Sequence, residues 1–231
     1  MQVDNIFVIG CGGIGSNLAK PLAKFLKYHI INTNRKTPLK FYIVDGDFVE
    51  DKNLQRQSFI QTDIGQNKAV VTSEDLSSSV PIETVQYLPI PSYLKEENLD
   101  FIVENSIVLV GVDNYITRRI IESYTEKLNN IAVIFGGNEY HDGDVNVLIR
   151  RNGVLVTPLL SEKHPEILKK DRFPDEVGCA EAQKSAPQII PTNLTVATIM
   201  LNAAFALLTT GEVKWHETFF DIKTGDYRVV V

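Results

Sequence analysis

A glycine-rich turn joins a short apolar run to a segment with helical periodicity near the start of the chain. Residues 5–10 form the apolar run, and Leu18, Leu22 and Leu26 recur at helical spacing after the turn. Glycines in this setting let the backbone approach a phosphate near the N-terminus of a helix, although a merely tight turn would carry the same residues. We expect a strand, turn and helix that bind a nucleotide. The glycines concerned are Gly10, Gly12, Gly13 and Gly15.

Strand and helix patterns continue to alternate through the first half of the chain. Pro89 is expected to end one strand, and Gly136 is expected to end another. Alternation over this length predicts an α/β fold with a doubly wound, Rossmann-like sheet that is mainly parallel. The predicted strands lie at residues 39–44, 82–88, 107–110 and 131–135, and the predicted helices at residues 68–79 and 117–128.

Residues 138–231 follow a different pattern. Alternating runs on either side of Asn152 and Gly153 predict a β-hairpin, and residues 215–221 and 227–231 predict a closing strand pair. These strands form an antiparallel C-terminal extension of the sheet. We therefore expect the 231 residues to form one domain.

A polar segment and an apolar helix separate the hairpin from the closing strands. Residues 158–190 are rich in proline and contain one short helical candidate at residues 165–170, so we expect a long crossover loop of functional importance. Pro191 suits the start of a helix, and residues 194–208 are almost wholly apolar. That helix is expected to be buried on most faces. The nucleotide-binding half accordingly ends near residue 137.

Composition excludes several classes of function. The formal net charge is −6 and no basic run occurs, which argues against nucleic-acid binding. We find no basic leader and no apolar run near the roughly 20 residues that span a bilayer, and expect a cytoplasmic protein without a membrane partner. Cys11 and Cys179 are too few and too isolated for a structural zinc site. The four histidines show no metal-binding spacing.

Acidic, amide and cationic residues follow the second predicted strand. Asp45 ends that strand and suits a pair of ribose hydroxyls, which fits either NAD or ATP. A triphosphate carries about four negative charges and needs donors and cations beyond the sugar, whereas an NAD-dependent oxidoreductase does not. A solvated loop before a helix is the alternative interpretation of this stretch. The candidate phosphate ligands are Asn53, Arg56, Gln57 and Lys68.

These motifs together resemble the superfamily of ThiF, MoeB and the ubiquitin-activating enzymes. Its pattern contains Gly-x-Gly-Gly-x-Gly, Asp-x-Asp-x-Val, Asn-Leu-x-Arg-Gln and Gly-x-x-Lys, which occur in this order between residues 10 and 68. An Asp-Asn pair after the fourth strand and a downstream arginine match Asp113, Asn114 and Arg118. The chain is most similar to small single-domain members, including the ThiF-like proteins of bacterial PRTRC plasmid-type systems. From the residues alone, Asp113 is either a ligand at the sheet edge or an N-cap.

The resemblance implies an ATP-dependent adenylyltransferase of the kind that activates ubiquitin-like modifiers. Its substrate would be the C-terminal carboxylate of a small ubiquitin-fold or sulfur-carrier protein, and two copies of the chain would form a homodimer. Asp45 and Asp47 would bind the nucleotide together with the glycine turn, and Asp113 would hold Mg²⁺. The implied triphosphate ligands are Asn53, Arg56, Gln57 and Lys68.

Fewer motif residues bear on the step after adenylation, in which the activated acyl group leaves AMP. Cys179 lies late in the long loop, where a thiolate can displace AMP and form a thioester; the alternative is a buried loop cysteine or the relic of a lost zinc site. Cys11 suits packing inside the turn. Many members of the superfamily begin with a segment whose arginine enters the partner's ATP site. Either that arginine comes from elsewhere, for instance from Arg150, Arg151 or Arg172, or catalysis is slower. A catalytically silent ATP-binding scaffold subunit and an NAD-dependent oxidoreductase are the alternative functions.

Overall fold

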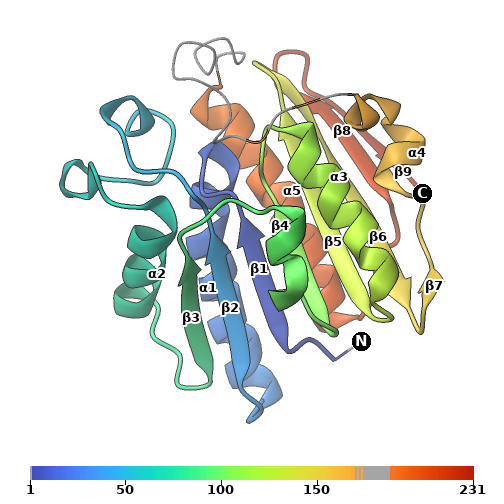
Figure 1. Cartoon of the computed structure of the whole chain (residues 1–231), viewed down its shortest axis with the longest axis horizontal. Coiled ribbons are helices and arrows are strands. Elements are labelled where there is room, and N and C mark those ends of the chain that lie inside the picture. The colour runs from blue at the N-terminus through green and yellow to red at the C-terminus, as the bar shows by residue number, and fades with distance from the viewer. Residues whose placement is uncertain (1, 170, 172, 174–187) are drawn as a thin grey trace.

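The computed structural model describes residues 2–169, 171, 173 and 188–231, and it shows a single open sheet with helices on both faces (Figure 1). The strand order is β3-β2-β1-β4-β5-β6-β8-β9, and β7 pairs with β6. The strands are β1 Asn5–Ile9, β2 Leu39–Val44, β3 Val85–Ile90, β4 Ser106–Val110, β5 Ile131–Asn138, β6 Asp142–Arg151, β7 Val154–Leu155, β8 Glu217–Asp221 and β9 Asp226–Val230. The helices are α1 Gly13–Thr33, α2 Lys68–Ser79, α3 Tyr115–Tyr124, α4 Leu160–Lys163 and α5 Ile190–Thr209, with short 3₁₀ turns η1 Asp51–Asn53, η2 Gln61–Asp63, η3 Glu96–Phe101, η4 Thr125–Lys127 and η5 Pro165–Leu168.

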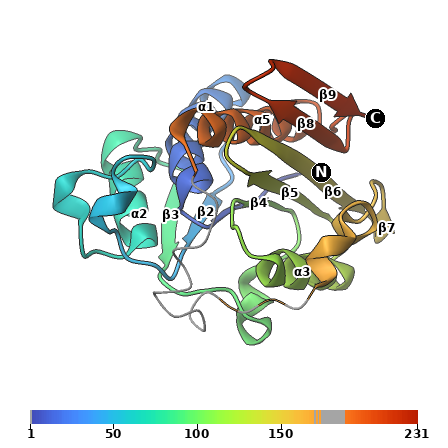
Figure 2. The same cartoon turned by 90° about the horizontal axis from the view of Figure 1, so that it is seen from above.

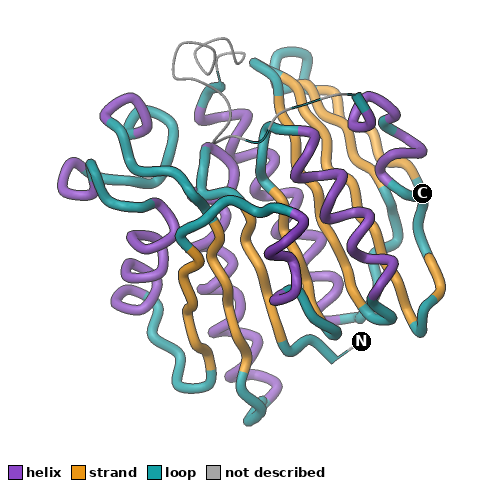
Figure 3. Tube along the Cα trace, viewed as in Figure 1, coloured by secondary structure: helices purple, strands orange, loops and turns teal. Residues whose placement is uncertain are grey.

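The sheet changes from parallel to antiparallel pairing along its width. Strands β1 to β5 pair in parallel, whereas β6, β8 and β9 pair antiparallel. Figure 3 shows these strands side by side, with the loops gathered at both ends of the strands. The predicted fold class, a mainly parallel Rossmann-like sheet with an antiparallel C-terminal extension, is confirmed.

Two apolar cores lie on opposite faces of the sheet. Helices α1, α2 and α5 cover one core, and α3 covers the other together with η3, α4 and η5 (Figure 2). Alternate side chains of β1 enter different cores, with Ile6 in the first and Phe7 in the second. Because both faces are covered, the central parallel strands β1 and β4 are buried along their whole length.

Two strands extend further than the sequence predicts. β3 continues through Pro89 because it is an edge strand. Its outer side has no neighbouring strand, so the missing N–H of proline breaks no hydrogen bond there. β5 continues through Gly136 and Gly137 because β6 pairs with it as far as Asn138 opposite Gly143. The prediction that these residues end their strands is therefore wrong.

Helix α5 keeps one exposed stripe. The side chains of Leu194 and Phe205 on that stripe are 44% and 50% exposed, whereas Val196, Met200 and Leu207 are buried. By length and composition α5 could also cross a membrane, contrary to the expectation that no segment approaches that size. Half of its most apolar window is buried, and the helix packs on α1, β5 and β6, which accounts for its composition.

Strand order places a crevice where the site is expected. β1 lies between β2 and β4. The chain therefore runs from β1 to β2 and β3 on one side, and then crosses to β4 and β5 on the other side of β1. Ligands of open α/β sheets bind in the crevice outside the carboxyl ends of the strands at such a point. The glycine turn after β1 and the loops after β2 and β4 meet there.

Candidate functional site

A cavity of about 900 Å³ opens at the carboxyl ends of β1, β2 and β4. It brings together residues from the glycine turn, the loop after β2, the start of α2 and the loop after β4. Nearly all of the residues predicted to bind the nucleotide therefore line the same cavity. Those that line the cavity are Gly10, Gly12, Gly13, Asp45, Asp47, Asn53, Arg56, Gln57, Lys68 and Asp113.

Gly10 and Gly12 shape the backbone that faces the cavity. Gly10 has a φ of +84°, and a Cβ there would lie 2.8 Å from Val112 Cγ1. Gly12 is the N-cap of α1, and an added Cβ would meet no atom within 4 Å. No side chain among the described residues caps the first turn of α1, so its backbone N–H groups can face an anion in the cavity.

Gly13 and Gly15 serve close packing. A Cβ on Gly13 would lie 2.3 Å from Nδ2 of Asn193, which enters from α5. A Cβ on Gly15 would lie 1.8 Å from the carbonyl oxygen of Gly10. Gly15 is not among the residues that line the cavity, and its contact with Gly10 shapes the turn; its role in cofactor binding stays a prediction.

Asp45 joins the loop after β2 to the glycine turn. Its Oδ2 accepts the backbone N–H of Cys11 at 2.5 Å, and its Oδ1 accepts that of Asp47 at 2.7 Å. The residue is 9% exposed, and burial raises the pKa of its carboxyl to about 6. Cys11 is fully buried, and burial raises the pKa of its thiol well above the usual value, as expected of a packing residue.

Lys68 is the first residue of α2 and its ammonium is buried. The Nζ atom donates a hydrogen bond to Asp47 Oδ2 at 3.0 Å. Asn67 caps the helix, since its Oδ1 accepts the backbone N–H of residues 69 and 70. Its Nδ2 donates to the backbone oxygens of Asp45 and Asp47, each at 3.0 Å. One asparagine therefore fixes both the loop after β2 and the start of the lysine-bearing helix.

The loop between β2 and α2 supplies Asn53, Arg56 and Gln57. Asn53 is buried, and its Oδ1 accepts the backbone N–H of Glu50 at 2.9 Å. Gln57 is 8% exposed, and its buried Oε1 accepts no hydrogen bond from the described residues. Arg56 Nη1 donates to Oε1 of Gln188 at 2.5 Å. The amide groups and the guanidinium therefore lie on one wall of the cavity.

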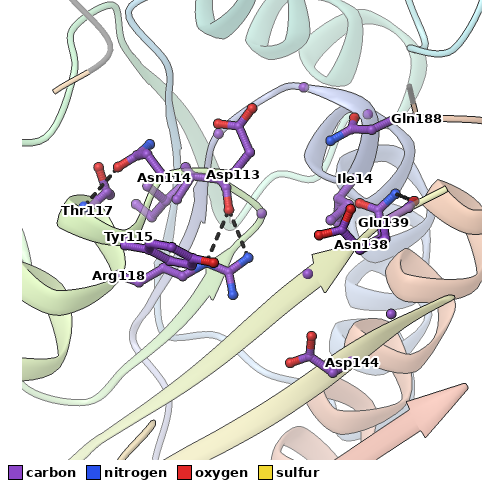
Figure 4. Close-up of a pocket in the computed structure, with 18 of the residues that line it drawn as sticks. Ile14, Asp113, Asn114, Tyr115, Thr117, Arg118, Asn138, Glu139, Asp144 and Gln188 are labelled. Atoms are coloured by element: carbon purple, nitrogen blue, oxygen red, sulfur yellow. Dashed lines mark hydrogen bonds between the residues drawn. The ribbon is translucent and has the colours of Figure 1, made fainter. Parts of the chain in front are cut away.

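Asp113 follows β4 and is free to bind a ligand. Asn114, not Asp113, caps α3, because its Oδ1 accepts the backbone N–H of Thr117 at 2.9 Å. Arg118 donates to the backbone oxygens of Val112 at 2.9 Å and Gly136 at 2.8 Å, which fixes the loop. Figure 4 shows Asp113 extending away from that guanidinium. Within the described part of the chain, its carboxylate makes no hydrogen bond or ion pair.

A cluster of ionisable groups lies at the other end of the cavity. His164 contacts Glu217 through Nε2 at 2.5 Å and Glu166 through Nδ1 at 3.0 Å. Burial opposes protonation of His164, but the two carboxylates outweigh burial and raise its pKa. Burial raises the pKa of Asp144, against the effect of nearby Arg118. The contacts of His164 tie the segment around α4 and η5 to strand β8.

Some predicted residues do not enter the site, and others were missed. Arg150 and Arg151 lie at the end of β6 away from the cavity, so neither is the expected arginine within this chain. Arg172 and Cys179 lie outside the described residues. Sequence reasoning missed the contributions of Tyr93, Asn67, Gln188 and Asn193. Only Asn67 left a local signal, since asparagine before a helical pattern is a common N-cap.

The motif order and the cavity that it builds agree with comparison to known families. The pattern that defines the ThiF family matches residues 2–229. The chain belongs to the ThiF family. Among curated relatives of this ThiF-family chain, a probable molybdopterin-synthase adenylyltransferase of Porphyra purpurea is 28% identical over 194 residues, covering 83% of this chain and 46% of that one. A Nedd8-activating enzyme E1 catalytic subunit of Drosophila melanogaster is 28% identical over 161 residues, covering 62% and 32%.

Solved structures share the fold of this ThiF-family chain. A crystal structure of PaaA has a TM-score of 0.70 at 18% identity, covering 97% of this chain and 62% of that one. E. coli MccB crystallised with ATP has a TM-score of 0.68 at 15% identity, covering 98% and 63%. The chain spans less than half the length of the two curated relatives above.

Proposed function

We propose that this chain is an ATP-dependent adenylyltransferase that activates the C-terminal carboxylate of a small ubiquitin-fold or sulfur-carrier protein. The observation that carries the proposal is the single cavity in which a ribose acceptor, two cations and an exposed carboxylate meet a helix N-terminus. Relatives named as an adenylyltransferase and as E1 catalytic subunits support the same class of reaction. An NAD-dependent oxidoreductase would not need the cations Arg56 and Lys68 at this position.

The reaction forms one bond to phosphorus and breaks another. A carboxylate oxygen of the substrate attacks the α-phosphorus of ATP, and the bond from that phosphorus to the β-bridging oxygen breaks and releases pyrophosphate. The nucleophile is already ionised, so no general base is needed. Arg56 and Lys68 stabilise the negative charge on the transferring phosphorus and on the leaving group. Asp45 accepts hydrogen bonds from the ribose hydroxyls.

Asp113 fits the role of a magnesium ligand. Mg²⁺ in nucleotide sites is usually held by one or two carboxylates together with substrate phosphates and water. Asp113 offers such a carboxylate, exposed and unpaired within the described part of the chain, on the cavity wall. The described residues contain no cluster of three protein ligands, so the ion would arrive with the nucleotide. When bound, Mg²⁺ would neutralise phosphate charge.

Pyrophosphate exchange into ATP tests the proposal directly. Wild type should exchange pyrophosphate in the presence of its protein substrate, whereas Asp113→Ala should not. Lack of exchange with every candidate ubiquitin-fold partner would overturn the proposed reaction. ATP binding without exchange would instead favour a silent scaffold subunit. We also propose a thioester at Cys179, formed when its thiolate attacks the acyl adenylate and AMP leaves, which predicts a thiol-labile adduct that Cys179→Ala abolishes while exchange persists.

The raised pKa of Asp45 predicts a pH-dependent nucleoside affinity. The carboxyl is ionised above about pH 6 and protonated below it, so its capacity to accept ribose hydrogen bonds is lost as pH falls. We expect the affinity for adenosine to be about tenfold lower at pH 5 than at pH 8. Calorimetric titration with adenosine checks this without the titration of ATP phosphates. Asp45→Asn should bind weakly at both values, and an unchanged wild-type affinity would contradict the assignment.

We further propose that two copies associate through the apolar surface of α1 and α5. Ile31 on α1 and Phe205 on α5 are 68% and 50% exposed, and Phe205 meets Phe25 edge to face with ring centroids 5.4 Å apart. Phe205→Glu should convert a dimer into a monomer in sedimentation velocity experiments, because a charge cannot be buried there without a partner. Val154→Glu, on exposed β7, is the matched control. A monomeric wild type at all concentrations would contradict the homodimer.

A further inference from the structure

Tyr93 lies in the loop that follows β3 and lines the cavity, although no motif includes it. Its ring packs against Gly46, where an added Cβ would lie 2.6 Å from ring atom Cδ2. Gly46 stands between Asp45 and Asp47, so the ring rests on the loop that carries both carboxylates. The backbone of the tyrosine is held in turn, since its carbonyl oxygen accepts a hydrogen bond from Asn98 Nδ2 at 2.9 Å.

The hydroxyl of Tyr93 is connected to the buried lysine through one carboxylate. It donates a hydrogen bond to Oδ1 of Asp47. The other oxygen, Oδ2, accepts the hydrogen bond from Lys68 Nζ at 3.0 Å. Asp47 therefore divides its two oxygens between a neutral donor and a cation. All three side chains line the same cavity.

This division of the carboxylate matters because a bare carboxylate at Asp47 would repel a triphosphate, so Asp47 contributes to nucleotide binding through Lys68 and not by direct contact with the phosphates. An uncompensated carboxylate beside the phosphates opposes binding, and a carboxylate free to turn can engage Lys68 through both oxygens. The tyrosine hydroxyl prevents both effects. It occupies Oδ1 and offsets part of its charge, so that the lysine keeps N–H groups for the nucleotide.

We propose that Tyr93 is a positioning residue that sets the orientation of Lys68 toward the ATP phosphates by holding Asp47. The inference rests on the proposed function, because it assigns Lys68 to the triphosphate. It adds a residue from the end of β3 to a site otherwise built from the loops after β1, β2 and β4 and from α2. Tyr93 acts through Asp47 and not on the reacting atoms.

Equilibrium titrations of ATP and adenosine against single variants test the proposal. Tyr93→Phe keeps the ring but removes the hydroxyl, and should weaken ATP roughly 2- to 10-fold, the range that corresponds to the net contribution of one hydrogen bond. Adenosine, which has no phosphate, should bind as it does to wild type. Tyr87→Phe is the matched control, because that hydroxyl on β3 bonds to the backbone oxygen of Val80 outside the cavity. It should change neither affinity.

A double-variant cycle separates positioning from a merely structural role. In an Asp47→Asn background, Tyr93→Phe should have no further effect on ATP affinity, because the carboxylate through which it acts is gone. Gly46→Ala displaces the ring and should reproduce the selective loss of ATP affinity. An equal loss of ATP and adenosine affinity, or additive effects in the cycle, would overturn the proposal.

Outcomes for the positioning role and for the proposed reaction remain distinguishable. If wild type binds ATP and the cycle shows coupling, but no pyrophosphate exchange occurs with any partner, the adenylation reaction fails and the role of Tyr93 stands. If exchange occurs and Tyr93→Phe has the same ATP affinity as Tyr87→Phe, the positioning role of Tyr93 is overturned and the adenylation reaction stands.

Discussion

Replacing Lys68 with methionine is expected to lower the rate of pyrophosphate exchange about 10²- to 10³-fold, the usual cost of removing one group that stabilises transition-state charge. Methionine fills a similar volume, so the start of α2 should keep its packing. The loss has two causes. The cation at the phosphates disappears, and the carboxylate of Asp47 is left without its ionic partner beside them.

A surface lysine provides the control for this variant. Lys20 pairs with Asp75 at 3.0 Å, and both side chains are more than 40% exposed. Exposed pairs contribute little to stability, so Lys20→Met should leave exchange and melting temperature unchanged. Adding Asp47→Asn to Lys68→Met should restore part of the ATP affinity without restoring turnover. An active Lys68→Met enzyme would remove the lysine from the mechanism.

Replacing Gly15 with alanine is expected to have the largest effect on folding. The new Cβ would lie 1.8 Å from the carbonyl oxygen of Gly10, and that contact is to backbone, which cannot move without opening the turn. We expect the free energy of unfolding to fall by more than about 3 kcal/mol, at or above the upper end of overpacking effects. Denaturant unfolding followed by circular dichroism measures this loss.

Gly12 offers the matched substitution in the same turn. A Cβ at Gly12 meets nothing within 4 Å, so Gly12→Ala should fold with wild-type stability. The added methyl enters the space beside the N-terminus of α1, and ATP affinity should therefore fall. Equal stability losses at Gly12 and Gly15 would show that the turn is sensitive to any side chain and would contradict the division between packing and binding glycines.

Local patterns were sufficient for much of the fold. The strand before the glycine turn and the helix at residues 68–79 depend on apolar periodicity and capping, which are properties of neighbouring residues. The path of β3 through Pro89 depends on its place at the sheet edge, and the length of β5 depends on its pairing with β6. Both causes depend on neighbouring strands and not on the residues of the segment itself, so these strand ends could not be predicted from the local sequence.

The candidate site likewise contains residues that local motifs predict and residues that only the fold brings in. Asp45, Arg56 and Lys68 belong to spaced motifs, and the cavity gathers them as expected. Tyr93 and Gln188 contact those residues from distant segments, and a single side chain in an otherwise featureless loop gives no periodic signal. The packing contact of Gly15 with Gly10 could not be predicted either, because a glycine required for packing looks the same in the sequence as one that faces a ligand.

The close fit of Gly13 against Asn193 has an evolutionary consequence. The amide of Asn193 is fully buried, bonds to the backbone oxygen of Arg56 and to Asn138, and leaves no room for a Cβ at Gly13. Alignments of related chains should therefore show these two columns changing together, with alanine or serine at the first only where a smaller residue replaces the asparagine. Such paired changes would mark lineages in which other contacts replace the hydrogen bond from Asn193 to the backbone of Arg56.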